Sequence, residues 1–201
     1  MNFRIVLTFA AAVGLSACTI APDGPQTAVD LPLQLEKLKN VTHWQISGKM
    51  AVRTKQEAVS ANLNWKTDGT DFDFRLSNVL GVTLAHMAYR DGIATLRADG
   101  KTYTHTDPSV LIYQVTNWDI PIAKLQNWIK GLPLEQDSYR LNDKQLLTSL
   151  SPGCSACGFW QVNYDQYSNI DDLWLPHQLT LTQPHHSTTM LKIKINQWTI
   201  R

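Results

Sequence analysis

The sequence lacks an excess of either charge. Its 18 Lys and Arg residues face 17 Asp and Glu residues, with no basic stripe or nucleic-acid motif, so no nucleic-acid partner is expected. It also lacks a nucleophile elbow, a phosphate-binding loop and an HExxH motif, and we expect neither an enzyme nor a cofactor. The N-terminal apolar run, Ile5 to Leu15, is shorter than the roughly 20 residues that a membrane-spanning helix needs.

Cysteine is scarce, with three residues in the chain. Cys154 and Cys157 lie in a CSAC segment. They could be a redox pair, half of a metal site or a small disulfide. No second CxxC completes a zinc site, so no metal is expected. Because the segment lies among turn residues, we favour a local disulfide that stiffens a hairpin tip.

The third cysteine follows the N-terminal apolar run. Arg4 precedes the run, and Leu15-Ser16-Ala17-Cys18 ends it with a tetrad that resembles the bacterial lipobox. We predict that residues 1–17 are a signal peptide and that Cys18 is lipidated. The alternative is a secreted protein, cleaved nearby, that keeps Cys18 as a free thiol. Two or more acyl chains anchor a protein stably, and Thr19, in place of the Asp of bacterial inner-membrane sorting signals, favours the outer membrane.

The remaining chain suits one domain. Removal of residues 1–17 deletes one basic residue, Arg4, and no acidic one, which leaves 17 of each sign. Residues 18–30 carry Pro, Gly and Asp without apolar periodicity and are expected to be a flexible tether. Residues 31–201 are expected to form a single domain, whose first helix Asp30 can cap.

Beyond the first helix, apolar and polar residues alternate, which is the pattern of half-buried strands. From Trp44 the pattern predicts about six antiparallel strands, then two short helices that start at Pro108, after the N-cap Asp107, and near Pro121. Three further strands are expected at residues 159–164, 173–182 and 189–200. The chain is thus mainly β with helices (α+β), and we expect an open, strongly curved antiparallel half-barrel with helices in its concave side.

The segment SNVLGV, residues 77–82, is apolar where a turn between two strands is normally polar. Two interpretations are open. Val79 and Leu80 fold back onto the domain while Gly81 permits the turn, or Leu80 protrudes and meets a partner.

Titratable side chains offer little chemistry. His177 and the pair His185-His186 are more simply explained by a solvated hairpin turn than by a metal site. His105 and Asp107 resemble an acid-base pair, yet Asp107 already serves as a helix cap.

The aromatic residues have two explanations. Seven Trp and five Phe residues either build the core or, on a curved sheet, line a cavity for an apolar ligand. The inward candidates for such a cavity are Trp44, Ile46, Met50, Leu63, Trp65, Phe72, Phe74 and Trp128.

Several segments together resemble one family. WQISGKMAV with SANLNW, LSNVLGVTLA, IPIAKLQNWIKGLP, and LPHQLTLTQ with LKIKINQW are similar, in order and spacing, to the LolB family of outer-membrane lipoprotein-insertion proteins. The similarity spans roughly residues 40–201. The chain departs from the family at the CSAC turn and at Val79, where the family often has Pro.

This resemblance implies a LolA/LolB-like half-barrel that encloses an apolar cavity. Such a protein is expected to be a monomer, anchored in the outer membrane and facing the periplasm. It receives acylated lipoprotein cargo from the periplasmic carrier LolA and inserts it into the inner leaflet of the outer membrane. The resemblance assigns membrane insertion to Leu80, flanked by Val79 and Gly81.

Two other classes stay open from the residues alone. A structural or assembly lipoprotein would bind protein or glycan through surface Trp residues, and it would have no interior cavity. An envelope hydrolase would need a polar cleft with a nucleophile and a base, and it ranks last.

Overall fold

The structure is a computed structural model that describes residues 24–153, 160–183 and 189–201. Cys18, Cys154, Cys157, His185 and His186 lie outside the described residues, so what we expect of them stays a prediction.

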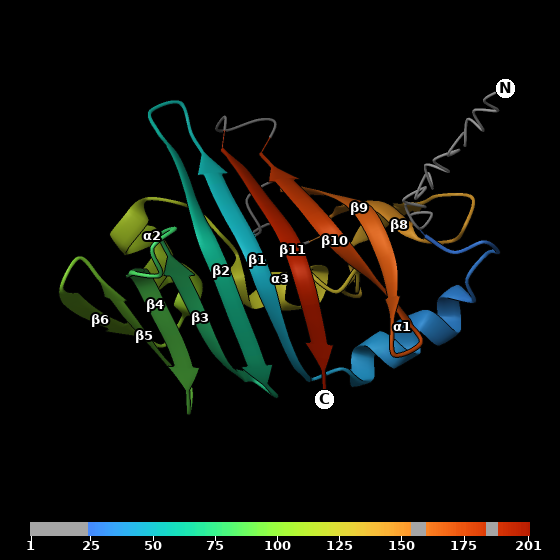
Figure 1. Ribbon diagram of the computed structural model, residues 1–201, viewed down its shortest axis with the longest axis horizontal. Helices are drawn as coiled ribbons and strands as arrows, with labels where there is room; N and C mark the ends of the chain where they lie inside the picture. The colour runs from blue at the N-terminus through green and yellow to red at the C-terminus, as the bar shows by residue number, and fades with distance from the viewer. Residues whose placement is uncertain (1–23, 154–159, 184–188) are drawn as a thin grey trace, which may run out of the picture.

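One antiparallel sheet contains every strand of the described residues (Figure 1). It has 11 strands in the order β6-β5-β4-β3-β2-β1-β11-β10-β9-β8-β7. The first strand pairs with the last, with Trp44 opposite Ile200 and Val52 opposite Leu191. The strands are β1 His43–Arg53, β2 Ala58–Asp68, β3 Asp71–Ser77, β4 Thr83–Arg90, β5 Ile93–Ala98, β6 Lys101–His105, β7 Ser138–Leu141, β8 Leu147–Ser151, β9 Gln161–Ile170, β10 Leu173–Thr182 and β11 Met190–Ile200.

Three helices accompany the sheet: α1 Leu31–Asn40, α2 Pro108–Thr116 and α3 Ile122–Trp128. The predicted caps are confirmed. The Asp30 carboxylate accepts a hydrogen bond from the Leu33 N–H at 3.1 Å, and the Asp107 carboxylate accepts one from the Ser109 N–H at 2.8 Å. These bonds fix where α1 and α2 begin, because they satisfy N–H groups that have no partner inside the helix.

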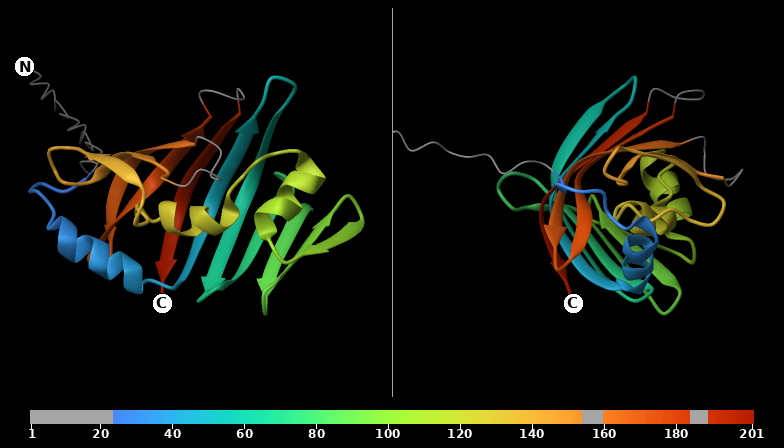
Figure 2. Two further views of the ribbon diagram at one scale, coloured as in Figure 1. Left: turned by 180° about the vertical axis from the view of Figure 1, so that it is seen from behind. Right: turned by 90° about the vertical axis from the view of Figure 1, so that its right-hand side faces the viewer.

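The sheet curves around the helices, and α2 and α3 lie in its concave side (Figure 2). This confirms the expected open half-barrel. The core lies between the inward face of the sheet and the helices, where the side chains of Trp65 and Trp128 are completely buried.

The alternating pattern predicts six strands before α2, as the structure has, but it misses two of the five strands that follow. β7 is almost entirely exposed, and β8 is short, so neither has a clear alternating pattern. β9 also continues to Ile170, well past the predicted end at residue 164. Gln166 there has a φ of 58°, a local irregularity that breaks the simple alternation.

Gly48 allows the first and last strands to approach each other. The pairing of β1 with β11 shifts between Ser47 and Gly48, where β11 carries an extra residue. A Cβ atom on Gly48 would lie 2.0 Å from the carbonyl oxygen of Lys194, far inside van der Waals contact. Only glycine fits this bulge without moving one of the two strands.

We therefore expect Gly48→Ala to lower the free energy of unfolding by roughly 1–3 kcal/mol, the usual cost of overpacking. Urea denaturation measures this change. Ser47→Ala, on the same strand, is the control and should change stability little. Equal stability of the Gly48→Ala protein and the wild type would show that the strands separate freely at the bulge.

Candidate functional site

The concave side of the sheet holds an apolar cavity beneath α2 and α3. Its volume is about 70 Å³. Every lining residue is apolar except Thr116, whose hydroxyl donates to the Ile112 carbonyl at 2.8 Å. The lining residues are Met50, Phe74, Leu76, Ala85, Met87, Leu96, Ala98, Ile112, Val115, Thr116, Trp118, Ile120, Ile122 and Leu125. The cavity therefore offers contact to hydrocarbon and almost no hydrogen bonding.

Of the eight residues expected to line a cavity, Met50 and Phe74 do so. The other six lie in the surrounding core and are buried: Trp44, Ile46, Leu63, Trp65, Phe72 and Trp128. The period-two pattern identified their inward direction correctly, but it could not tell a cavity wall from packed core.

An aromatic cluster supports the cavity from below. The Trp65 ring meets Phe74, which lines the cavity, with centroids 5.4 Å apart, and Trp44 with centroids 5.3 Å apart, both edge to face. Trp44 in turn contacts Trp198 at 5.6 Å. Such contacts hold rings in fixed orientations, so this side of the cavity is rigid. The buried Trp65 indole N–H has no acceptor among the described residues, and nothing in the structure accounts for it.

Most of the rest of the wall comes from β4, β5, the helices and the connection between α2 and α3, none of whose wall residues was predicted to line a cavity. Met87 and Leu96 continue the inward alternation, and Ala85 lies opposite Ala98 on the neighbouring strand. Two small side chains at one level leave the room that the cavity occupies. The alternation in TLAHMAYR was the available signal for Ala85 and Met87.

The connection between α2 and α3 is held over the cavity by two polar contacts. The Trp118 indole N–H donates to the Glu57 carboxylate at 3.2 Å, and the Trp160 indole N–H donates to the Asp119 carbonyl at 3.0 Å. The first contact is exposed to solvent, so it contributes little to stability and breaks easily.

Lys130, in the NWIKGLP segment, is a buried cation. Its Nζ donates to the carbonyl oxygens of Leu38 at 3.0 Å and Val41 at 2.7 Å. These carbonyls lie at the end of α1, where the helix dipole favours a positive charge. Removal from water lowers the pKa of Lys130 to about 8. The residue thus joins the turn after α3 to the end of α1.

The free energy of unfolding should rise between about pH 8 and pH 10.5 because of Lys130. In this range the folded chain has released the proton, whereas the unfolded chain keeps it up to the ordinary pKa of 10.5. Unfolding then takes up a proton, so stability increases with pH. Lys130→Met should abolish this contribution. The measurement is urea denaturation of both proteins across the range.

Burial also raises the pKa of Tyr164 and Tyr167. Because the wild type and Lys130→Met both contain these tyrosines, their contribution cancels when one free energy of unfolding is subtracted from the other. If the free energy of unfolding of the wild type fell relative to that of Lys130→Met as the pH rises, the assignment to Lys130 would be wrong.

The β3–β4 loop is a folded turn with exposed apolar side chains. Val79 and Leu80 are 89% and 84% exposed, so neither folds back onto the domain. The Asn78 side-chain oxygen accepts hydrogen bonds from the N–H groups of Leu80 and Val82, both at 3.0 Å. Gly81 takes a φ of 81°, which the turn requires. In the side view of Figure 2 the loop, in green, protrudes on the side of the sheet opposite the helices.

The titratable candidates do not form a catalytic site in the described part of the chain. The His105 ring contacts the backbone of Asp107, while the Asp107 carboxylate caps α2. The His177 ring lies between the Ser168 hydroxyl at 2.6 Å and the Ile195 carbonyl at 2.8 Å. No three His, Cys, Asp or Glu side chains gather closely enough to hold a metal in residues 24–153, 160–183 and 189–201.

No helix within the described residues has the length and apolar character that a membrane span requires.

Comparison with known proteins gives a consistent result. The family model described as "Outer membrane lipoprotein LolB" matches residues 42–198. The outer-membrane lipoprotein LolB of Aeromonas hydrophila is 40% identical over 165 residues, which cover 82% of this chain and 80% of that protein. The LolB protein of Aeromonas salmonicida is 36% identical over 200 residues, covering 98% and 97%.

Among solved structures, a LolA superfamily protein from Nitrosomonas europaea has a similar fold. Its TM-score is 0.56 at 10% identity, with 87% of this chain and 94% of that chain covered. At this identity the likeness concerns the fold alone.

Proposed function

Because this chain belongs to the LolB family of outer-membrane lipoproteins, we propose that it accepts acylated lipoproteins from the periplasmic carrier LolA and inserts them into the outer membrane. The family is one of lipoprotein-trafficking proteins and not of enzymes. The observation that carries the proposal is the apolar cavity under α2 and α3, whose lining offers contact to hydrocarbon and almost no hydrogen bonding.

The cavity is too small for an acyl chain in this conformation. Pockets for small ligands measure roughly 300–1,000 Å³, whereas this cavity measures about 70 Å³. Acyl chains enter only if α2, α3 or their connection moves away from the sheet. The exposed contact between Trp118 and Glu57 is the weak point at which such a movement begins.

Transfer requires no nucleotide. A cavity that binds acyl chains more tightly than the donor draws cargo forward, by about 1.4 kcal/mol for each tenfold difference in affinity. Insertion into the bilayer must be more favourable still.

The anchor is proposed from the sequence. Cleavage after residue 17 and acylation of Cys18 tether a monomeric domain, facing the periplasm, to the inner leaflet. The tether of residues 18–30 is attached to the domain at its end, because the Val29 N–H donates to the Lys144 carbonyl at 3.0 Å and the Lys144 ammonium to the Gln26 carbonyl at 2.8 Å. The part of the chain that links the lipid to the domain therefore ends at Gln26, before the first helix begins.

The structural or assembly alternative required a strip of surface Trp residues. The chain has seven Trp residues, all within the described part, and each of them is buried or half-buried. The described residues therefore offer no strip of exposed Trp side chains for glycan or protein, and they surround an apolar cavity instead.

Filling the cavity should block cargo binding without unfolding the protein. We expect Ala85→Leu with Ala98→Leu to occupy the space between the two residues and to weaken binding of a fluorescent fatty acid about tenfold or more. Thermal unfolding should change little, because the added side chains enter empty apolar volume.

The control is Ala88→Leu, on the outward face of β4, which should bind the fatty acid normally. Normal binding by the filled variant would place the acyl chain elsewhere.

Leu80 is proposed to enter the membrane when cargo is released. Removal of one Leu side chain from water contributes roughly 1.5–3 kcal/mol, enough to orient the protein but not to anchor it. Leu80→Glu should leave folding and acceptance of cargo from LolA unchanged, and should lower insertion into vesicles about tenfold.

Ile93→Glu serves as the control: it replaces another exposed side chain of the same size as Leu, at the start of β5, opposite the last residue of β4. Loss of cargo acceptance in the Leu80→Glu protein would assign the loop to the carrier instead of the membrane.

A further inference from the structure

The outward face of the sheet carries a cluster of basic side chains around the base of the β3–β4 loop. We call it the basic surface; its residues, all exposed, are Lys49, Arg53, Arg75, Arg97, Lys192 and Lys194. We propose that the basic surface binds the anionic headgroups of membrane lipids and so holds the protruding loop against the bilayer. This proposal rests on the membrane role proposed for Leu80.

The strand register places these cations beside the loop. Lys194, Lys49, Asn62 and Ser77 are successive cross-strand partners on β11, β1, β2 and β3. With strands about 4.8 Å apart, the backbone of Lys49 lies roughly 10 Å from Ser77, where the loop starts. The Asn62 side chain, between them, donates to the Asn78 carbonyl at 3.0 Å and ties the loop to this row.

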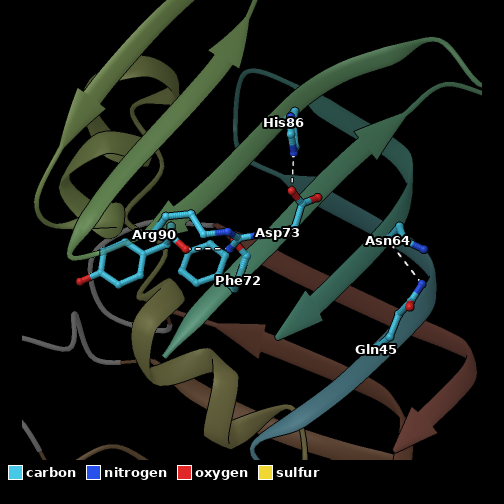
Figure 3. Close-up of polar contacts among 7 residues, drawn as sticks. Gln45, Asn64, Phe72, Asp73, His86 and Arg90 are labelled. Carbon is cyan, nitrogen blue, oxygen red and sulfur yellow. Dashed lines mark hydrogen bonds and ion pairs between the residues drawn. The ribbon is translucent and has the colours of Figure 1, made fainter. Parts of the chain in front are cut away.

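A second row lies on the other side of the loop. Arg75 is opposite His86 on β4, and His86 is opposite Arg97 on β5. His86 is bound to the carboxylate of Asp73, two residues before Arg75 on β3, at 2.7 Å (Figure 3), so this carboxylate already has a partner. Cations therefore flank the apolar loop on both sides of its base.

The cations of the basic surface have no carboxylate partner among the described residues. Within the described residues the ion pairs are His43 with Asp68 and His86 with Asp73, and neither includes a residue of the basic surface. The cross-strand row that contains Lys49 and Lys194 continues through Gln178 on β10 to Asp165 on β9. Asp165 is the carboxylate of this row. Asn64, the cross-strand partner of Arg75, is neutral and accepts a hydrogen bond from the Gln45 side chain at 3.5 Å (Figure 3).

Lys49 and Lys194 lie directly opposite each other on neighbouring strands. Like charges in this arrangement oppose strand pairing, so the fold does not need them. An external anion would remove the repulsion. Phospholipid headgroups fit best because the same face carries Val79, Leu80 and Val82, and apolar side chains flanked by cations suit the interface of an anionic bilayer.

The test uses the chain from residue 18 onward with Cys18→Ser, so that no acyl anchor hides weak binding. This chain keeps the whole described fold. Its partition is measured onto phosphatidylcholine vesicles with and without phosphatidylglycerol, at low and high salt. We expect tighter binding to the phosphatidylglycerol vesicles, with the gain lost at high salt.

The variant is Lys49→Gln with Lys194→Gln. Its binding to phosphatidylglycerol vesicles should fall roughly 25-fold, about fivefold for each lysine, while binding to pure phosphatidylcholine stays unchanged. Lys124→Gln with Arg140→Gln is the control, because it removes the same charge from exposed sites on α3 and β7 and should keep its binding. Folding of the first variant should be at least as stable as wild type, since a like-charge pair is gone.

If both double variants lost binding to phosphatidylglycerol vesicles equally, net charge would explain the binding and the proposal would be overturned. Loss of cargo acceptance from LolA, with lipid binding unchanged, would assign the basic surface to a protein partner and also overturn it. Failure of the function proposed for Leu80 looks different: Leu80→Glu would insert cargo normally, while binding that depends on phosphatidylglycerol persists.

Discussion

The pairing of the first strand with the last organises this molecule. β1 and β11 lie at the centre of the sheet, and each is the start of a meander that runs outward to one edge. Without their pairing the two meanders would be separate sheets, neither curved around the helices. The close approach at Gly48 belongs to this pairing, as do the inward residues Trp44 and Trp198, whose rings meet across the two strands. Cavity, helices and outer face all take their positions from it.

The alternating pattern in the sequence was sufficient for the first half of the sheet and for the direction of its side chains. Asp30 and Asp107 revealed the starts of two helices because capping is a local interaction. The sequence did not reveal β7 and β8 because β7 is almost entirely exposed and β8 is short, so neither has a clear alternating pattern. Sequence also pointed to the apolar turn at Leu80 and left two interpretations open, and the structure shows that Leu80 is exposed.

The site shows the same division. Met50 and Phe74 were recognised because they lie on regular strands. Ile112, Ile122 and Leu125 were not assigned to the cavity, since nothing local says which apolar helix residues meet a space and which meet packed side chains. The cations Lys49 and Lys194 look unremarkable in sequence, about 145 residues apart, and become a pair only through the long-range register of β1 with β11.

The hydrogen bonds of Asn78 have a consequence for the speed of delivery. A loose loop loses conformational entropy when it is fixed in a bilayer, by about 1–2 kcal/mol for each residue ordered. Here Asn78 has already fixed the backbone of Leu80 and Val82 in water. Little loss of backbone entropy therefore opposes entry of the loop into lipid, and the loop need not unfold to leave it. In the membrane role proposed for Leu80, the loop would be a preformed wedge that enters and leaves the bilayer unchanged.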